Sequence, residues 1–118
     1  MKAKVGVELW IDFAHSLRGH RKCEPKHGHT ARVVIEVEGE LKGGDALEGH
    51  MVMDFDDLKR ISKEAVAELD HRDLDEVFEF PTIENVAKRI FEKLCEMGVG
   101  VCRVTVYEGE GKWCTIER

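Results

Sequence analysis

Several residue types and motifs are missing from this chain of 118 residues. Gln is absent and Asn occurs once, at Asn85, whereas charged residues make up 36% of the sequence. This bias is typical of heat-adapted proteins. No window of 18 apolar residues occurs, so we expect no membrane-spanning helix and no membrane partner. The first residues form a strand pattern instead of the apolar core of a signal peptide.

The cysteine spacing and the net charge indicate where the protein acts and which partners it lacks. The four cysteines show no C-x-x-C spacing. Because no export signal precedes them, we expect reduced thiols and a cytoplasmic protein. The formal net charge of -6 argues against general binding of nucleic acid. The length suits one domain, residues 1–118.

The hydrophobic periodicity predicts four strands and two helices. Strict alternation indicates strands over 2–13 and 30–40, and a hairpin over 101–108 and 112–117. Helical spacing follows a predicted N-cap at Asp54 and ends near Leu69, and a second helix opens at Pro81-Thr82 and stops at Gly98. We interpret 72–80 as a loop. This order predicts an α+β fold in which one four-stranded antiparallel sheet carries both helices on one face.

Three histidines lie where the first two predicted strands meet. His27 and His29 share one strand face, because residues i and i+2 point the same way. His15 would join them if the first strand continued two residues further, although a bulge would break this parity. Three imidazoles with an open fourth position are typical of a catalytic zinc site. The alternative is that the histidines are metal-free residues at a loop edge.

Two further features have both functional and structural interpretations. The segment 16–26 is basic in an acidic protein and predicts either a phosphate clamp or a solvated loop; its cationic residues are Arg18, Arg21, Lys22 and Lys26. Glu108 ends an apolar row of a strand. It either has a partner there or lies at a solvated strand end.

Six short stretches follow one another along the chain. They are Phe13-Ala14-His15, Cys23-x-x-x-His27-Gly28-His29, Met51-Val52-Met53-Asp54-Phe55, Leu69-Asp70-His71-Arg72-Asp73-Leu74, Pro81-Thr82-x-Glu84-Asn85 and Glu108. No single stretch is specific, but the set spans nearly the whole chain. In this order the six stretches resemble the 6-pyruvoyltetrahydropterin synthase and 6-carboxytetrahydropterin synthase family.

The resemblance implies a fold, an assembly and a set of site residues. The family's tunnelling fold has the order β-β-α-α-β-β, and its members assemble through trimers into hexamers that close a barrel, with active sites at subunit boundaries. By resemblance, Zn²⁺ is the cofactor. The implied zinc ligands are His15, His27 and His29; the implied catalytic residues are Cys23, Asp70 and His71; and the implied pterin contacts are Glu108, Thr82 and Glu84.

The implied reaction begins with 7,8-dihydroneopterin triphosphate and eliminates triphosphate. A thiolate near a metal and cations is a suitable base, so Cys23 is expected to remove the proton, and His71 oriented by Asp70 to move protons. Glu108 would accept the two adjacent N–H groups of the pterin as a fork. The basic residues Arg18, Arg21, Lys22 and Lys26 are our own hypothesis for the triphosphate.

Several products and one non-enzymatic role remain open. The three-residue gap between Cys23 and His27 favours 6-carboxytetrahydropterin, a deazaguanine-nucleoside precursor, over 6-pyruvoyltetrahydropterin for biopterin. A further subset uses Glu in place of the thiol and makes a folate precursor, and here Glu24 adjoins Cys23. From another class, a zinc-stabilised oligomeric pterin-binding module would need only the histidines. Two departures from the family pattern are Ile83, where relatives often have Ser or Thr, and an extra residue at Gly49-His50-Met51.

Overall fold

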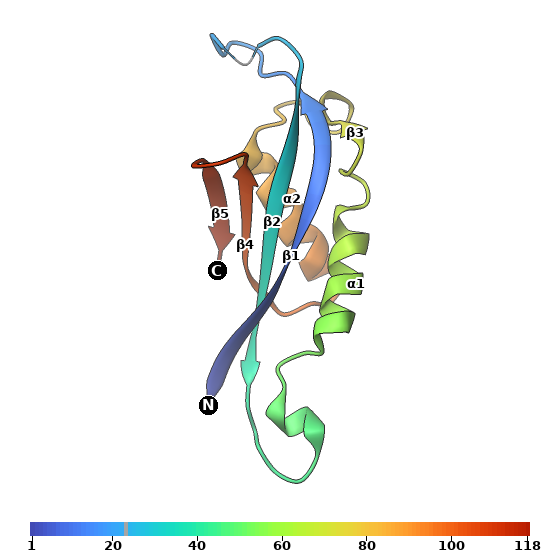
Figure 1. The fold of residues 1–118 in the computed structure, drawn as a ribbon, viewed down its shortest axis with the longest axis vertical. Coiled ribbons are helices and arrows are strands. Elements are labelled where there is room, and N and C mark those ends of the chain that lie inside the picture. Colours follow the sequence, from blue (N-terminus) through green and yellow to red (C-terminus); the bar gives the residue numbers. More distant parts are fainter. Residues whose placement is uncertain (23) are drawn as a thin grey trace.

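A computed structural model describes residues 1–22 and 24–118 of the chain. Two long strands run the length of the molecule and are followed by two helices and a hairpin (Figure 1). The strands and helices are β1 (Lys2–His15), β2 (His27–Glu40), α1 (Phe55–Val66), β3 (Arg72–Asp73), α2 (Ile83–Glu96), β4 (Val101–Glu108) and β5 (Trp113–Glu117). Two 3₁₀ turns, Leu47–His50 and Leu74–Glu76, precede α1 and follow β3.

In the part of the chain that the structure describes, one sheet holds five strands in the order β3-β1-β2-β4-β5. The pairs β1–β2, β2–β4 and β4–β5 are antiparallel, and β3 lies parallel to the end of β1. The predicted α+β class is confirmed, and the six predicted elements follow in the predicted order, but β3 and a 3₁₀ turn lie between the two helices where a loop over 72–80 was predicted. The predicted number of four strands was wrong, because β3 has only two residues and is too short to show alternation.

Side-chain caps begin both helices where the sequence predicts. The carboxylate of Asp54 accepts from the backbone N–H groups of Asp56 and Asp57, and the Thr82 hydroxyl oxygen accepts from that of Asn85. Helix α1 ends at Val66, three residues before the predicted end, because Leu69 and Asp70 already turn back onto the Val66 carbonyl. This turn leads the chain straight into β3 beside β1.

The core lies between the sheet and the helices, which pack on the same face of it (Figure 1). Alternate residues of β1 and β2 supply its sheet side, including Ile11, Val33 and Ile35, each at most 1% exposed. The matching stripe on α2 is fully buried and consists of Val86, Ala87, Ile90 and Leu94. This one-sided packing leaves the ends of β1 and β2 near His15 and His27 free to form a site.

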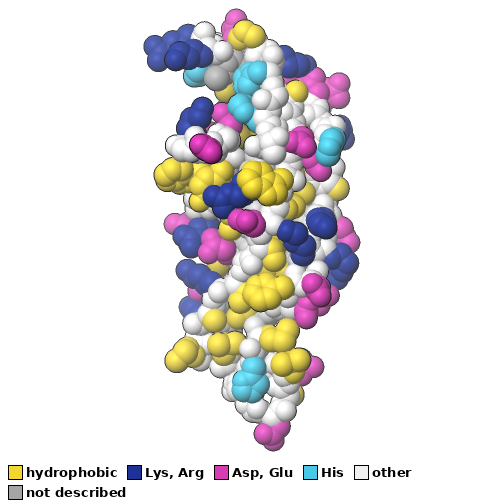
Figure 2. Space-filling view, viewed as in Figure 1, with side chains coloured by type: hydrophobic (Ala, Val, Ile, Leu, Met, Phe, Trp, Pro, Cys, Tyr) yellow, Lys and Arg dark blue, Asp and Glu magenta, His cyan; other side chains and the backbone are white. Residues whose placement is uncertain are grey.

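The opposite face of the sheet is exposed and carries large hydrophobic side chains among charged ones (Figure 2). Trp10 and Trp113 are 60% and 62% exposed, and Arg32 stacks on the ring of Tyr107. The chain measures 57 × 22 × 22 Å with a radius of gyration of 15.9 Å, whereas a compact domain of this length has about 13.5 Å. The sheet is open. Within the part of the chain described, neither helix has the length and apolarity needed to cross a membrane.

Candidate metal centre and active site

The pairing of β1 with β2 brings the three predicted ligands together. It runs from Lys2 opposite Glu40 to His15 opposite His27 without a register shift, and Phe13 lies opposite His29. The ring centroids of the three histidines are 4.6, 4.8 and 5.0 Å apart. One nitrogen from each ring lies within 4.8 Å of the other two. The parity argument therefore holds, because no bulge interrupts these strand ends.

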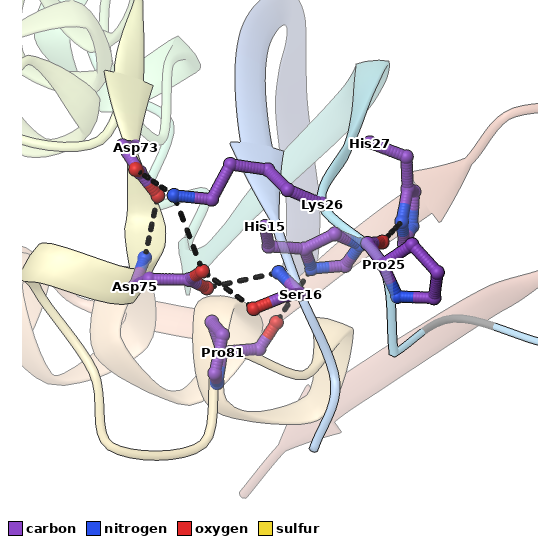
Figure 3. Close-up of polar contacts among 8 residues, drawn as sticks. All are labelled: His15, Ser16, Pro25, Lys26, His27, Asp73, Asp75 and Pro81. Carbon is purple, nitrogen blue, oxygen red and sulfur yellow. Dashed lines mark hydrogen bonds and ion pairs between the residues drawn. The ribbon is translucent and has the colours of Figure 1, made fainter. Parts of the chain in front are cut away.

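Backbone carbonyls orient two of the rings. His15 Nδ1 donates to the Pro81 carbonyl oxygen at 2.7 Å, and His27 Nδ1 donates to that of Pro25 at 2.8 Å (Figure 3). Since a carbonyl can only accept, both rings carry the proton on Nδ1 and present a lone pair at Nε2. Hydrogen bonds of this kind fix the tautomer of metal-binding histidines.

Two nitrogens inside the cluster lack a hydrogen-bond partner. His15 Nε2 and His29 Nε2 are buried, and neither has a partner among the described residues. Burial lowers the pKa of His29, an effect that the nearby Glu108 opposes and the other two histidines reinforce. This shift favours the neutral ring of His29, which is the form that binds a metal.

The carboxylate of Glu108 lies against the same two nitrogens. Its oxygens are 3.9 Å from His15 Nε2 and 3.7 Å from His29 Nε2. These distances are too long for hydrogen bonds. They are close to the separation between two ligand atoms of one tetrahedral zinc ion, which is about 3.4 Å. The unpartnered imidazole nitrogens and the adjacent carboxylate are therefore suitable ligands for a zinc ion. Glu108 is thus not at a solvated strand end.

A cavity of about 330 Å³ opens beside this cluster. Glu108 lines it on one side, and Thr82 and Glu84 line it from the start of α2. Ile83 lies in the wall between them. The predicted pterin contacts therefore share one cavity, and Glu108 joins that cavity to the histidine cluster.

Asp70 and His71 lie on another face of the molecule. Asp70 Oδ1 is 3.1 Å from His71 Nδ1, and His71 Nε2 is 3.7 Å from the carboxylate of Asp12. The Asp12 side chain is exposed, whereas Phe13 and His15 point to the buried face of β1. The alternation along β1 therefore places this pair on the face opposite the buried ring of His15, while His29 and His71 both line one cavity of about 510 Å³.

The predicted phosphate residues divide into two groups. Lys26 pairs with Asp73 and, at 3.5 Å, with Asp75 (Figure 3). The carboxylates of Asp73 and Asp75 hold the pKa of Lys26 above its usual range. Arg18, Arg21 and Lys22 are exposed, and the described residues offer none of them an ion pair within 4.0 Å. Of the four predicted phosphate residues, these three therefore keep their charge free for a ligand among the residues that the structure describes.

Cys23, the predicted base, lies outside the described residues. Its neighbour Glu24 turns its carboxylate onto its own loop, where Oε2 accepts from the backbone N–H of Gly19 at 3.1 Å. Glu24 is exposed. In this arrangement its carboxylate is engaged in the loop and not directed as a base.

Three contacts at the site escaped the sequence reasoning. These are Asp12 beside His71, the Pro81 carbonyl on His15, and Asp75, which accepts from both the N–H and the hydroxyl of Ser16 at 2.9 and 2.6 Å. The Ser16 contacts lower the pKa of Asp75. Only Asp12 left a signal, as an acidic residue directly before the Phe13-Ala14-His15 stretch. The other two depend on tertiary contacts of residues more than 58 positions apart.

Comparisons with known proteins agree with this geometry. A family model described as 6-pyruvoyl tetrahydropterin synthase matches residues 4–118. A putative 6-carboxy-5,6,7,8-tetrahydropterin synthase of Archaeoglobus fulgidus is 47% identical, over 97% of this chain and 95% of that protein. A dihydroneopterin monophosphate aldolase of Pyrococcus furiosus is 37% identical over 92% of each.

Comparison of the fold with solved structures indicates the same family. The structure of Caenorhabditis elegans 6-pyruvoyl tetrahydropterin synthase superposes with a TM-score of 0.84 and 27% identity, and the match covers 100% of this chain and 96% of that one. The predicted tunnelling fold is thereby confirmed. On the family model, the relatives and the fold together, the chain belongs to the 6-pyruvoyl tetrahydropterin synthase family.

Proposed function

We propose that this protein is a zinc-dependent lyase that acts on 7,8-dihydroneopterin triphosphate. It eliminates triphosphate, cleaves a carbon–carbon bond of the side chain with release of acetaldehyde, and yields 6-carboxy-5,6,7,8-tetrahydropterin. The observation that carries the proposal is the convergence of His15, His27 and His29 beside a cavity with two carboxylates. The 47% identity to the Archaeoglobus protein supports the carboxy product.

The residues have separate tasks in this proposal. The three histidines hold a zinc ion, which supplies Lewis-acid chemistry to the hydroxyls of the substrate side chain. Glu84 and Glu108 face the pterin from the two sides of the cavity, where a carboxylate can accept two adjacent N–H groups. Arg18, Arg21 and Lys22 attract the triphosphate.

Proton transfer needs a base and a shuttle. Cys23 takes the proton from the side-chain carbon next to the pterin ring, and His71, held by Asp70, moves protons between substrate and solvent. Because His71 lies against Asp12, on the face of β1 opposite the buried ring of His15, we propose that the Asp70–His71 pair of a second copy completes the centre. The open sheet edges, exposed tryptophans and elongated shape suit such a homo-oligomer, a hexamer by family resemblance.

A second candidate is cleavage of dihydroneopterin monophosphate by aldolase chemistry. The 37% identity to the Pyrococcus aldolase over 92% of each chain favours it. Against it, the Glu24 carboxylate, which would have to replace the thiol as base, is engaged with Gly19. The third outcome is 6-pyruvoyltetrahydropterin.

One experiment separates these products. Purified zinc-loaded protein is incubated with the triphosphate and, in parallel, with the monophosphate, and the pterins are identified by mass. The proposal expects the 6-carboxy product from the triphosphate. A 6-hydroxymethyl product from the monophosphate would establish the aldolase reading instead.

A matched pair of variants separates an enzyme from a pterin-binding module. Cys23→Ala is expected to keep zinc and lose turnover, while Cys95→Ala, remote in sequence and exposed, keeps both. Equal turnover by Cys23→Ala and the parent would remove the thiol from the mechanism.

A further inference from the structure

Asp12 contacts the Asp70–His71 pair through three separate groups. Its backbone N–H donates to Asp70 Oδ1 at 2.9 Å, and its carbonyl oxygen accepts from the backbone N–H of His71 at 2.6 Å. Its carboxylate Oδ2 lies 3.7 Å from His71 Nε2. No other described residue contacts both members of the pair in this way.

The Asp12 carboxylate is itself held in position. The hydroxyl of Thr30, on the neighbouring strand β2, donates to Asp12 Oδ1. The second oxygen, Oδ2, is then left on the side of the imidazole. His71 therefore lies between two carboxylates, with Asp70 at Nδ1 and Asp12 facing Nε2.

The backbone of His71 adopts a conformation that its own residue type disfavours. Its φ is 58°, in the left-handed region, and it is the only non-glycine residue with positive φ among those described. Such a conformation is unfavourable for a residue with a side chain and persists where surrounding contacts impose it. The hydrogen bond to the Asp12 carbonyl is one of those contacts.

The position of Nε2 decides what Asp12 can do. Asp70 occupies Nδ1, so Nε2 is the nitrogen left for proton exchange. A cavity of about 510 Å³ opens at this point, and its lining includes Asp12, His29, Thr30 and His71. Nε2 therefore meets solvent or a ligand next to the Asp12 carboxylate.

We infer that Asp12 is a positioning residue for proton transfer by His71. Its carboxylate orients the ring through Nε2, and its backbone fixes Asp70 and the His71 main chain. The inference rests on the proposed function, because it gives His71 a proton to move. It goes beyond that function by adding a residue outside the histidine cluster, the thiol and the Asp70–His71 pair.

The test separates the carboxylate of Asp12 from its backbone. Asp12→Asn keeps the backbone contacts and an oxygen for Thr30 but removes the charge. The matched control is Glu8→Gln, on the same exposed face of β1 four residues earlier. Asp12→Asn is expected to lower kcat on the order of tenfold with KM within about twofold, while Glu8→Gln changes neither. Formate is expected to restore part of the turnover of Asp12→Ala.

The variants distinguish a failure of the role of Asp12 from a failure of the proposed function. Turnover by Asp12→Asn equal to that of Glu8→Gln, with His71→Ala inactive, would overturn the role of Asp12 and leave the proposed function intact. Full turnover by His71→Ala would instead overturn the proposed mechanism. If the parent protein forms no pterin product, the ring signal of His71 in NMR spectra decides: it is expected to shift in Asp12→Asn and not in Glu8→Gln, and an unshifted signal would refute the contact.

Discussion

His15 Nδ1 donates a 2.7 Å hydrogen bond to the carbonyl oxygen of Pro81, 66 residues away. This bond joins the end of β1 to the residue just before the N-cap of α2. It also turns Nε2 toward the other two histidines. One contact therefore sets the tautomer of a candidate ligand and fixes the wall of the adjacent cavity.

Removal of one histidine should remove the metal. We expect the parent protein to bind one zinc ion per chain, and His29→Ala to lose more than about 100-fold in zinc affinity. His50→Ala is the control, because His50 lies far from the cluster and contacts the Gly44 carbonyl. Metal analysis after dialysis against a chelator measures both. Equal zinc content in the two variants would contradict the site.

The two cavity carboxylates should differ in their effects. Glu108 lies within 4 Å of two ligand nitrogens, so Glu108→Gln is expected to lower zinc affinity about tenfold as well as turnover. Glu84 lies at the start of α2, and Glu84→Gln is expected to raise KM about tenfold with zinc affinity unchanged. Titration with a zinc chelator and steady-state kinetics separate the two. The same zinc affinity and the same KM in the two variants would show that the short distances from Glu108 to the histidines do not matter for function.

The unpaired cations of the loop should govern recognition of the triphosphate. Reversing the charges of Arg21 and Lys22 to Glu is expected to raise KM about tenfold, and the difference should shrink at high salt. Lys42→Glu, beyond the far end of β2, serves as the control for a general change in charge. An unchanged KM in the double variant would exclude this loop as the phosphate site.

Asp75 should stabilise the protein in a pH-dependent manner. Its pKa is lowered by the Ser16 hydrogen bonds, so its contribution is present above its ordinary pKa of 3.8 and disappears as pH falls through the lower folded value. Asp75→Asn is expected to cost about 1 kcal/mol of unfolding free energy at pH 7 and progressively less below pH 4. Denaturant unfolding at several pH values measures this. A constant difference down to pH 2 would contradict the assignment.

The sequence predicted more of the fold than of the contacts between distant segments. Alternation in β1 and β2 was enough to place His15, His27 and His29 on one face, because strand parity is local. It could not give β3, whose two residues have no period, nor the early end of α1, which tertiary packing decides. The Pro81 and Asp75 contacts join segments that only folding brings together, so no spacing rule could find them.

The placement of His71 on the face of β1 opposite the buried ring of His15 has a consequence for genetics. On the proposed assembly, each working centre combines the histidine cluster of one polypeptide with the Asp70–His71 pair of its neighbour. Two dead alleles, one encoding His29→Ala and the other His71→Ala, would then complement each other when expressed in the same cell, because mixed assemblies regain some intact centres.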